Sequence, residues 1–195
     1  MMKQLEKMLD EAIILDNKVI KVDQFVNHQI NIDLFREIRN LFYEHFKHQK
    51  VTKIVTCEAS GIAVAMMCGL AFNVDVVFAK KGSSLLTNSN YYTETVYSYT
   101  KQKESQFMID RRFINENDHV LLVDDFLANG EAMNGLISIC HQARAAIVGL
   151  GVVIEKGFQV GGKQLREKGY DVCSLVIVDQ IENNQIIKYH SSLLK

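Results

Sequence analysis

The chain has 195 residues, of which 48% are hydrophobic, enough apolar material for one domain with a sizeable core. A formal net charge of −1 and a pI near 6.6 give no overall electrostatic reason to expect nucleic acid or an anionic membrane as partner. No stretch approaches the roughly eighteen apolar residues of a membrane span, and the N-terminus scatters charges through any possible signal core. Four widely spaced cysteines in apolar surroundings predict buried thiols, so we expect a cytoplasmic protein.

The first quarter of the chain predicts two amphipathic helices. Apolar residues recur at helical spacing over Leu5–Ile13 and again over Phe35–Phe46, with charged residues between them. The intervening segment Val19–Ile30 alternates like short strands or an irregular flap.

From Lys53 onward the pattern changes to strand, turn, helix and strand, which is typical of an α/β fold. Lys53–Cys57 predicts a strand, Ile62–Phe72 a helix and Val74–Lys81 a second strand. The segment Gly82–Lys103 is rich in Ser, Thr, Asn and Tyr, and predicts a long loop that leads into a hairpin arm. Loops of this length inside compact domains are usually functional.

The second half of the chain continues the alternation of strands and helices. We expect these units to extend a parallel sheet with helices on its faces, closed by an edge strand after a turn at Asn183 and Asn184. The predicted strands are Phe107–Phe113, His119–Asp125, Ala145–Glu155 and Val172–Val178, and the predicted helices are Gly130–Arg144 and Lys163–Lys168.

Two adjacent carboxylates, Asp124 and Asp125, follow the apolar run Val120–Val123, where a buried strand is expected to end. The small residues of Ala128–Ala132 then lead into a helix, whose free backbone N–H groups and positive dipole end favour a phosphate. Ligands of open α/β sheets bind at this edge, and ionised carboxylates suit a ribose diol. An ordinary turn with an N-cap aspartate explains one carboxylate but not the pair. The pattern therefore favours a phosphoribosyl ligand.

A second anion site is predicted at Glu58–Gly61, which also joins a strand to a helix at the same edge of the sheet. Lys80 and Lys81, at the end of the next strand, could supply positive charge for a second anion. A plain turn followed by two solvated lysines explains these residues about as well, so both interpretations stay open.

Two other patterns resemble functional motifs, but their residues do not support those functions. Gly157–Gln164 matches G-x-x-x-x-G-K, but Gln164 stands where a nucleoside triphosphatase needs a hydroxyl for magnesium. His45 and His48 are spaced i, i+3 without a carboxylate or cysteine nearby in sequence, which is more typical of solvated side chains than of a metal site. No arrangement of residues indicates a covalent nucleophile.

The segment VLLVDDFLANGEA resembles the phosphoribosyl pyrophosphate motif of the type I phosphoribosyltransferases. The segments KVDQFVNHQI, TKIVTCEASGIA, YSYTKQKES and VVIEKGFQ extend the resemblance to nearly the whole chain. It implies a single domain over residues 1–195, with a mostly parallel sheet flanked by helices, a flexible loop and hairpin arm, and a small hood. The hood is expected from about residues 16–31 with about residues 156–195.

The resemblance also implies a homodimeric purine-salvage enzyme that transfers the phosphoribosyl group of phosphoribosyl pyrophosphate to xanthine, giving xanthosine 5'-monophosphate and pyrophosphate. A Mg²⁺ ion chelated mainly by the substrate would neutralise the leaving group, so no protein ligand to a metal is expected. Val64 and Asp75 stand where relatives commonly carry proline, which leaves the motif residues intact.

Carried over residue by residue, the resemblance assigns four groups. Asp124 and Asp125 are the catalytic pair on the ribose hydroxyls; Ala128, Asn129, Gly130, Glu131 and Ala132 bind the 5-phosphate; Glu58, Ala59, Ser60, Gly61 and Lys81 bind pyrophosphate; and Ile20, Asn27 and Lys156 hold the purine.

Residue chemistry separates the candidate bases only in part. Lys156 carries only donors, so it suits a 6-oxo group and disfavours adenine, while Asn27 could present either end of its amide. A guanine- or hypoxanthine-preferring enzyme, a non-catalytic regulator that senses the same donor, and an RNA-binding relative remain alternatives.

Overall fold

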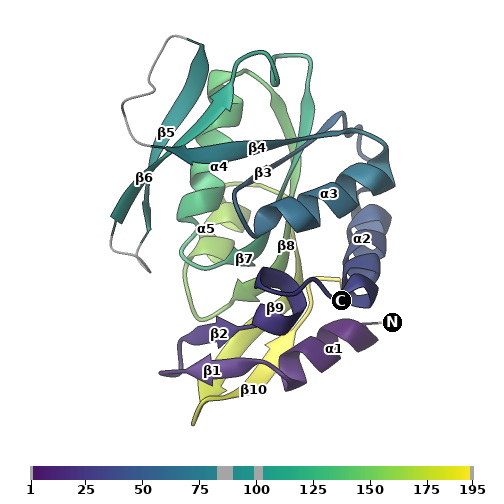
Figure 1. Cartoon of the computed structure of the whole chain (residues 1–195), viewed down its shortest axis with the longest axis vertical. Helices are drawn as coiled ribbons and strands as arrows, with labels where there is room; N and C mark the ends of the chain where they lie inside the picture. The colour runs from purple at the N-terminus through teal and green to yellow at the C-terminus, as the bar shows by residue number, and fades with distance from the viewer. Residues whose placement is uncertain (1, 83–89, 99–102, 194–195) are drawn as a thin grey trace.

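The computed structural model describes residues 2–82, 90–98 and 103–193, and its centre is an eight-stranded sheet (Figure 1). The strand order is β10-β9-β8-β7-β3-β4-β6-β5. The five central strands run parallel: β3 (Lys53–Cys57), β4 (Asp75–Gly82), β7 (His119–Leu127), β8 (Ala146–Lys156) and β9 (Val172–Glu182). The sheet confirms the predicted α/β class.

Antiparallel strands close both edges of this sheet. At one edge, β10 (Gln185–His190) returns along β9 after a turn in which Asn183 and Asn184 adopt positive φ angles of 50° and 57°. The predicted turn and closing strand are confirmed. At the other edge, β5 (Tyr91–Ser98) and β6 (Lys103–Asp110) form a hairpin that pairs with β4 through β6.

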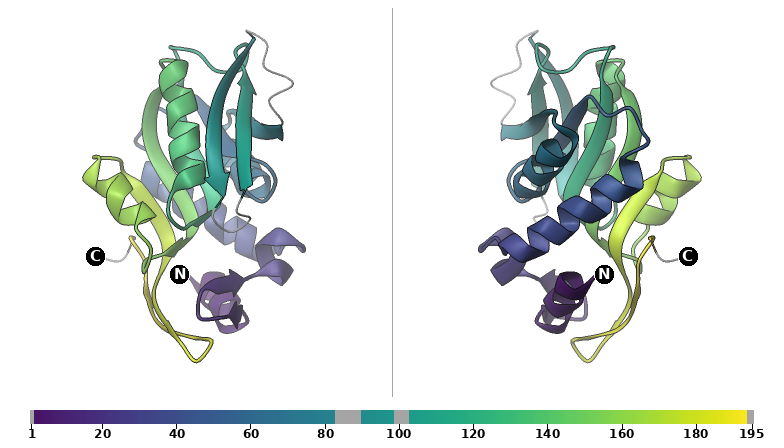
Figure 2. Two further views of the ribbon diagram at one scale, coloured as in Figure 1. Left: turned by 90° about the vertical axis from the view of Figure 1, so that its left-hand side faces the viewer. Right: turned by 90° about the vertical axis from the view of Figure 1, so that its right-hand side faces the viewer.

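Helices cover both faces of the sheet because the central strands are apolar on both sides. In β7, Leu121 and Val123 face one hydrophobic cluster while Val120 and Leu122 face the other, as strand alternation requires. Figure 2 shows α2 (Ile32–Phe46) and α3 (Gly61–Phe72) on one face and α4 (Glu131–Gln142) on the other. The short helix α5 (Gly161–Glu167) adds Leu165 to the α4 side.

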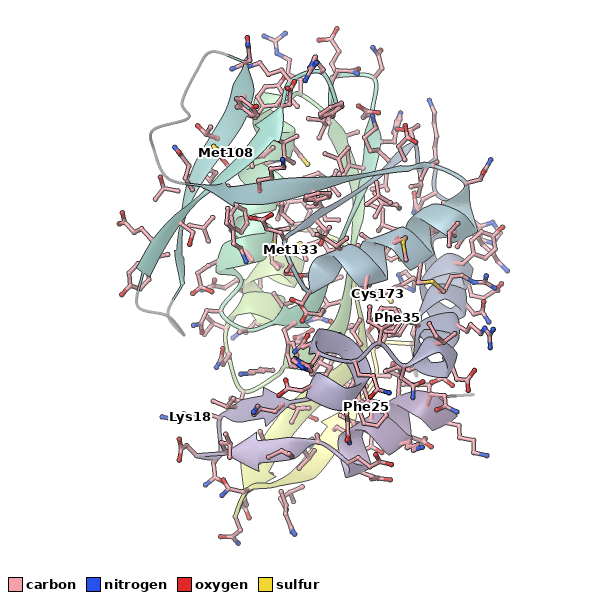
Figure 3. All side chains as sticks on the ribbon, viewed as in Figure 1. Lys18, Phe25, Phe35, Met108, Met133 and Cys173 are labelled. Atoms are coloured by element: carbon pink, nitrogen blue, oxygen red, sulfur yellow. The ribbon has the colours of Figure 1, made fainter. Side chains whose placement is uncertain are left out.

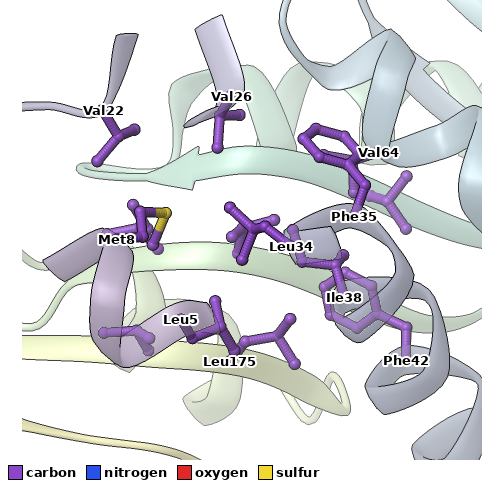
Figure 4. Packing of buried hydrophobic residues seen from close by; sticks show 14 of the residues in the cluster. Leu5, Met8, Val22, Val26, Leu34, Phe35, Ile38, Phe42, Val64 and Leu175 are labelled. Atoms are coloured by element: carbon purple, nitrogen blue, oxygen red, sulfur yellow. The ribbon is translucent and has the colours of Figure 1, made fainter. Parts of the chain in front are cut away.

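The N-terminal segment forms a separate layer beside β9 and β10, at the lower end of Figure 1. It consists of α1 (Lys3–Asp10), the hairpin β1 (Ile13–Leu15) and β2 (Val19–Lys21), and the π-helical turn η1 (Asp23–Asn27). Asn17 in the hairpin turn and Asn184 exchange two hydrogen bonds, of 3.0 and 2.7 Å, from backbone N–H to side-chain oxygen. Leu5 and Met8 of α1 pack toward Leu175 of β9 (Figure 4).

The structure corrects two expectations about the elements. The first helix ends at Asp10, and Ile13 lies in β1, where it pairs with Lys21 of β2. The segment around Phe107 is an antiparallel strand that ends at Asp110, not a unit of the parallel sheet. The expected hairpin arm is confirmed, since residues 91–98 form β5 and pair with β6; residues 83–89 lie outside the described residues.

The prediction for the cysteines is confirmed, since all four are buried free thiols. His45 was expected to be solvated, but its Nε2 lies 3.0 Å from a carboxylate oxygen of Asp171, a residue distant in sequence. In the described part of the chain, no three His, Cys, Asp or Glu side chains form a group suited to a metal. None of the described helices is both long and apolar enough to cross a membrane.

Candidate active site

A cavity of about 500 Å³ lies where β7 and β8 end, between the sheet edge, the hairpin of β5 and β6 and the N-terminal layer. It is lined by Lys18, Val19, Lys81, Val96, Tyr97, Ser105, Phe107, Ala128, Asn129, Glu131, Ala132, Lys156 and Gln159. Ligands of open α/β sheets bind at this edge of the strands. The cavity therefore joins three of the four predicted residue groups in one place.

The loop of residues 128–130, here called the phosphate loop, enters α4 with its backbone donors free of side-chain caps. Gly130 is the N-cap of α4, has a φ of 94° and offers no side chain to the first turn. The first N–H groups of a helix have no intrahelical acceptors, and the helix dipole makes this end attractive to anions. The loop thus has the free backbone donors that the predicted phosphate site requires.

Asp124 and Asp125 lie within β7 and not at its end, because the strand continues to Leu127. Each is only 6% exposed, and neither lines the cavity. Burial raises the pKa of Asp124 well above its ordinary value of 3.8, and the neighbouring charge of Asp125 raises it further. The Asp124 carboxylate accepts a 3.1 Å hydrogen bond from the backbone N–H of Asp125. The pair is thus buried and forms no part of the cavity wall.

The predicted pyrophosphate loop, Glu58–Gly61, lies directly beside Asp124. A Cβ atom at Gly61 would stand 2.7 Å from the nearer carboxylate oxygen of Asp124 and closer still to the hydroxyl of Thr56. Gly61 is therefore required by the close approach of α3 to β7. Glu58 accepts a hydrogen bond from the backbone N–H of Lys81, which ties this loop to the end of β4.

Only one member of the pyrophosphate group, Lys81, lines the cavity. Its ammonium lies 5.7 Å from the centre of the Phe107 ring, a cation–π contact that connects β4 with the hairpin of β5 and β6. Lys80, the other lysine considered, lines a different hollow beside Phe78 and Arg112.

Lys156 lies at the end of β8, on the side of the cavity closed by the N-terminal layer. Its ammonium donates a 2.9 Å hydrogen bond to the backbone carbonyl of Lys18, which Figure 3 shows at the tip of the β1–β2 hairpin. Partial burial lowers the pKa of Lys156 below 10.5. Ile20 is buried in the core and Asn27 is exposed; neither lines the cavity in this conformation.

Several cavity residues were not anticipated from the sequence. Val96, Ser105 and Phe107 come from the hairpin of β5 and β6, whose side chains reach the cavity only through sheet pairing with β4. Gln159 follows Lys156 in a turn closed by a 2.9 Å bond from the Gln159 N–H to the Lys156 carbonyl. The sequence predicted a hairpin arm within Gly82–Lys103 but gave no signal for which of its side chains line the cavity.

A parallel sheet edge with an uncapped helix start, a buried acidic pair and a lysine at the end of the next strand is typical of an α/β protein that binds a phosphorylated ligand. The model of the phosphoribosyl transferase domain matches residues 21–189, more than half of the chain, and the chain belongs to this family.

Curated relatives match almost end to end. A protein named xanthine phosphoribosyltransferase from Bifidobacterium adolescentis is 49% identical over 193 residues, covering 97% of this chain and all of the relative. A protein of the same name from Finegoldia magna is 46% identical over 187 residues, covering 96% of this chain and 98% of the relative. Another, from Bacillus cereus, is 49% identical over 181 residues, with 93% and 92% coverage.

Solved structures agree with the fold. An adenine phosphoribosyltransferase from Thermoanaerobacter pseudethanolicus has a TM-score of 0.73 at 18% identity, over 89% of this chain and 98% of that one. The Giardia lamblia enzyme complexed with 9-deazaadenine has the same TM-score at 18% identity, over 87% and 95%. At this identity the likeness establishes the architecture and leaves the choice of base to the site.

Proposed function

We propose that this protein transfers the 5-phosphoribosyl group of phosphoribosyl pyrophosphate to xanthine, releasing pyrophosphate and xanthosine 5'-monophosphate. The observation that carries the proposal is the placement of Lys156 in the cavity that also contains the phosphate loop. A phosphate site and a donor for an oxo group thus lie in one cavity. The names of relatives at 46–49% identity over most of the chain support xanthine as the base.

The proposed binding roles follow the geometry. Residues 128–132 hold the 5-phosphate through backbone N–H groups, and Asp124 and Asp125 accept hydrogen bonds from the ribose hydroxyls. Because both carboxylates are buried and do not line the cavity, the sugar has to approach close to β7 to reach them. The loop Glu58–Gly61 and Lys81 receive the pyrophosphate.

In the proposed reaction, the bond between ribose C1 and pyrophosphate breaks as a purine nitrogen forms the new bond to C1. Positive charge builds on the sugar and negative charge on the leaving group, so the site stabilises both without a covalent nucleophile. In this proposal Asp125 stabilises the positive charge on the sugar, and Lys81 stabilises the negative charge on the pyrophosphate. Cavity walls from β5 and β6 orient the base and reduce competition from water.

We infer that Mg²⁺ takes part, held mainly by oxygens of the donor. The donor set accords with this: within the described ranges no cluster of three His, Cys, Asp or Glu forms a metal site, and the nearby carboxylates of Asp124 and Asp125 are buried. When bound, Mg²⁺ supplies charge neutralisation on the pyrophosphate. Lys81 and the Glu58–Gly61 loop then orient that group.

Base choice follows from hydrogen-bond chemistry at Lys156. An ammonium group has three donors and no acceptor, so it pairs with the 6-oxo group of xanthine, guanine or hypoxanthine and not with the 6-amino group of adenine. Ile20 and Asn27 are proposed to complete the purine site, Asn27 at the 2-oxo edge. Both have to approach the cavity when the base binds.

The wider organisation is also a proposal. We infer one domain over residues 1–195, with a hood of about residues 16–31 and 156–195, supported by the paired bonds between Asn17 and Asn184. Four buried free thiols support a reducing, cytoplasmic setting. We propose a homodimer as the working form, in keeping with the family resemblance.

The test is pyrophosphate release from phosphoribosyl pyrophosphate and Mg²⁺ with xanthine, guanine, hypoxanthine or adenine supplied separately. We expect the highest kcat/KM with xanthine and no turnover of adenine. A higher kcat/KM with guanine or hypoxanthine would overturn the choice of base. Donor binding without base-dependent release would overturn the enzyme itself and favour a sensor on this fold.

A further inference from the structure

The segment Gly161–Lys168, here called the α5 segment, lies directly against the phosphate loop. The N–H of Gly161 donates a 3.1 Å hydrogen bond to the carbonyl of Ala128. A Cβ atom at Gly161 would stand 2.7 Å from the carbonyl carbon of Asn129 and 2.7 Å from the nitrogen of Gly130. The two backbones are in contact, and any side chain at residue 161 would displace the loop.

The far end of the α5 segment reaches the same loop through Asn134. The Lys168 ammonium donates a 3.0 Å hydrogen bond to the Asn134 side-chain oxygen. The Asn134 side-chain amide donates in turn, at 2.8 Å, to the carbonyl of Gly130. Both ends of the segment are therefore joined to the loop that enters α4.

The middle of the α5 segment is joined to β8 by an ion pair between the partly exposed Arg166 and the buried Glu155. Arg166 donates two hydrogen bonds, of 2.8 and 2.7 Å, to the carboxylate of Glu155, which is 3% exposed. The hydroxyl of Ser174 also donates to this carboxylate. A Cβ atom at Gly162 would collide with Glu155, so the segment fits closely over it. Glu155 directly precedes Lys156 in β8.

We propose that the α5 segment fixes the distance between the phosphate loop and Lys156, with Gly161, Arg166 and Lys168 as positioning residues. This inference rests on the proposed function, in which the loop holds the 5-phosphate and Lys156 holds the base. The two ligands react only when they are held at bonding distance, and a misplacement of about 1 Å costs roughly 100-fold in rate.

The same contacts explain the second glycine of the pattern G-x-x-x-x-G-K, Gly162, which packs on the Glu155 carboxylate. Gly161 lies between the two glycines of that pattern and is small because it packs on the phosphate loop. Packing of the α5 segment thus accounts for both residues.

The first experiment compares Lys168→Ala with Lys163→Ala. Both lysines are exposed and lie on or next to α5. Among the contacts that the structure describes, Lys163 pairs only with Glu167 of the same helix, at 3.8 Å. We expect Lys168→Ala to raise the KM for phosphoribosyl pyrophosphate about threefold, the low end of the range for one hydrogen bond because this bond is exposed, with the KM for xanthine unchanged. Lys163→Ala should match the wild type in both.

The second experiment uses Arg166→Lys, which keeps the charge beside Glu155 but loses the two-pronged hydrogen bond. A role in stability alone would lower the unfolding temperature and leave kcat of the folded enzyme unchanged. The positioning role predicts a fall in kcat of on the order of tenfold at saturating substrates, measured well below the unfolding temperature. An unchanged kcat would overturn the assignment of Arg166.

Binding of ribose 5-phosphate, measured by calorimetry without turnover, separates this inference from the proposed function. The probe should bind the wild type and Lys163→Ala equally and Lys168→Ala about threefold more weakly. Equal binding by all three would overturn the inference even if the wild type turns over xanthine. If the wild type turned over no base, weaker binding by Lys168→Ala would still support the contact between the α5 segment and the phosphate loop.

Discussion

The ammonium of Lys156 and the backbone carbonyl of Lys18 are joined by a 2.9 Å hydrogen bond across 138 residues of sequence. This bond connects the end of a central strand with the tip of the N-terminal hairpin. Since an ammonium has three donors, Lys156 can keep this bond and still donate to a ligand in the cavity. The N-terminal hairpin is thus held in place by the same side chain that is proposed to select the base.

Replacing Lys156 with Met removes all three donors and keeps a side chain of similar length. We expect kcat/KM for xanthine to fall about 10- to 100-fold, the usual value of a hydrogen bond to a charged group. The ratio of kcat/KM for adenine to kcat/KM for xanthine should rise, because the donor that disfavours the amino group of adenine has been removed. Steady-state kinetics with both bases checks this.

Lys21→Ala is the matched control for Lys156→Met, since Lys21 lies on the hairpin that Lys156 contacts and pairs with Asp23 at 3.2 Å at the surface. A Lys156→Met enzyme that kept both its xanthine kinetics and its preference over adenine would remove Lys156 from base recognition.

The pH dependence of base binding should depend on the same side chain. Partial burial lowers the pKa of Lys156 below 10.5, so the ammonium loses its proton at a lower pH than an exposed lysine does. We expect xanthine affinity of the wild type to fall with rising pH below 10.5. The Lys156→Arg variant should not show this fall in affinity, because arginine stays protonated.

The ratio of wild-type to Lys156→Arg affinities, followed against pH, removes the ionisation of xanthine itself. A ratio that does not change with pH would contradict the proposal that the Lys156 ammonium binds the base. The partly buried charge of Lys156 lowers the free energy of unfolding at neutral pH, whereas a salt bridge would raise it. This penalty disappears above pH 10.5, where Lys156 has lost its proton in the unfolded chain as well as in the folded protein.

Asp124→Asn should stabilise the protein while it lowers activity. The folded pKa of Asp124 lies above 3.8, so ionisation of this buried carboxyl destabilises the folded state as the pH rises above that value. Removing the charge should raise the free energy of unfolding by about 1–3 kcal/mol at pH 7. The gain should vanish at pH values below 3.8. Urea unfolding at both pH values is the measurement.

Asp125→Asn should reduce turnover strongly, by roughly 100-fold, if this carboxylate stabilises the positive charge on the sugar. The KM for the donor should change less than kcat, because the charge develops in the transition state. Circular dichroism confirms that the variant is folded. Near-normal kcat would remove Asp125 from the mechanism.

Glu131→Gln should improve donor binding. The carboxylate of Glu131 lies in the first turn of α4 and lines the cavity, beside the proposed site of the 5-phosphate. Removing this like charge should lower the KM for phosphoribosyl pyrophosphate about two- to fivefold at low salt. The helix should lose about 0.3–1 kcal/mol, because an acidic residue favours the helix N-terminus.

The effect of Glu131→Gln should shrink as salt is added, since it acts through charge at a partly exposed site. A raised KM would instead mean that Glu131 takes part in holding the donor or its Mg²⁺.

The sequence by itself determined the alternation of strands and helices, the closing turn at Asn183 and Asn184, and the loop at residues 128–130. These features depend on local patterns: apolar runs of strand length, residues that accept positive φ, and small residues before a helix. It also indicated the position of Asp124 and Asp125, although their burial within β7 was not apparent from the run of apolar residues before them.

Only the tertiary structure determined which strands, loops and side chains lie next to one another around the cavity. The walls from β5 and β6 arrive through antiparallel pairing with β4, and the α5 segment packs on the phosphate loop through Gly161. Lys156 finds its partner in the carbonyl of Lys18, a backbone atom that every residue possesses. Contacts of this kind leave no side-chain signature in the sequence, because they depend on which backbones the fold brings within hydrogen-bond distance.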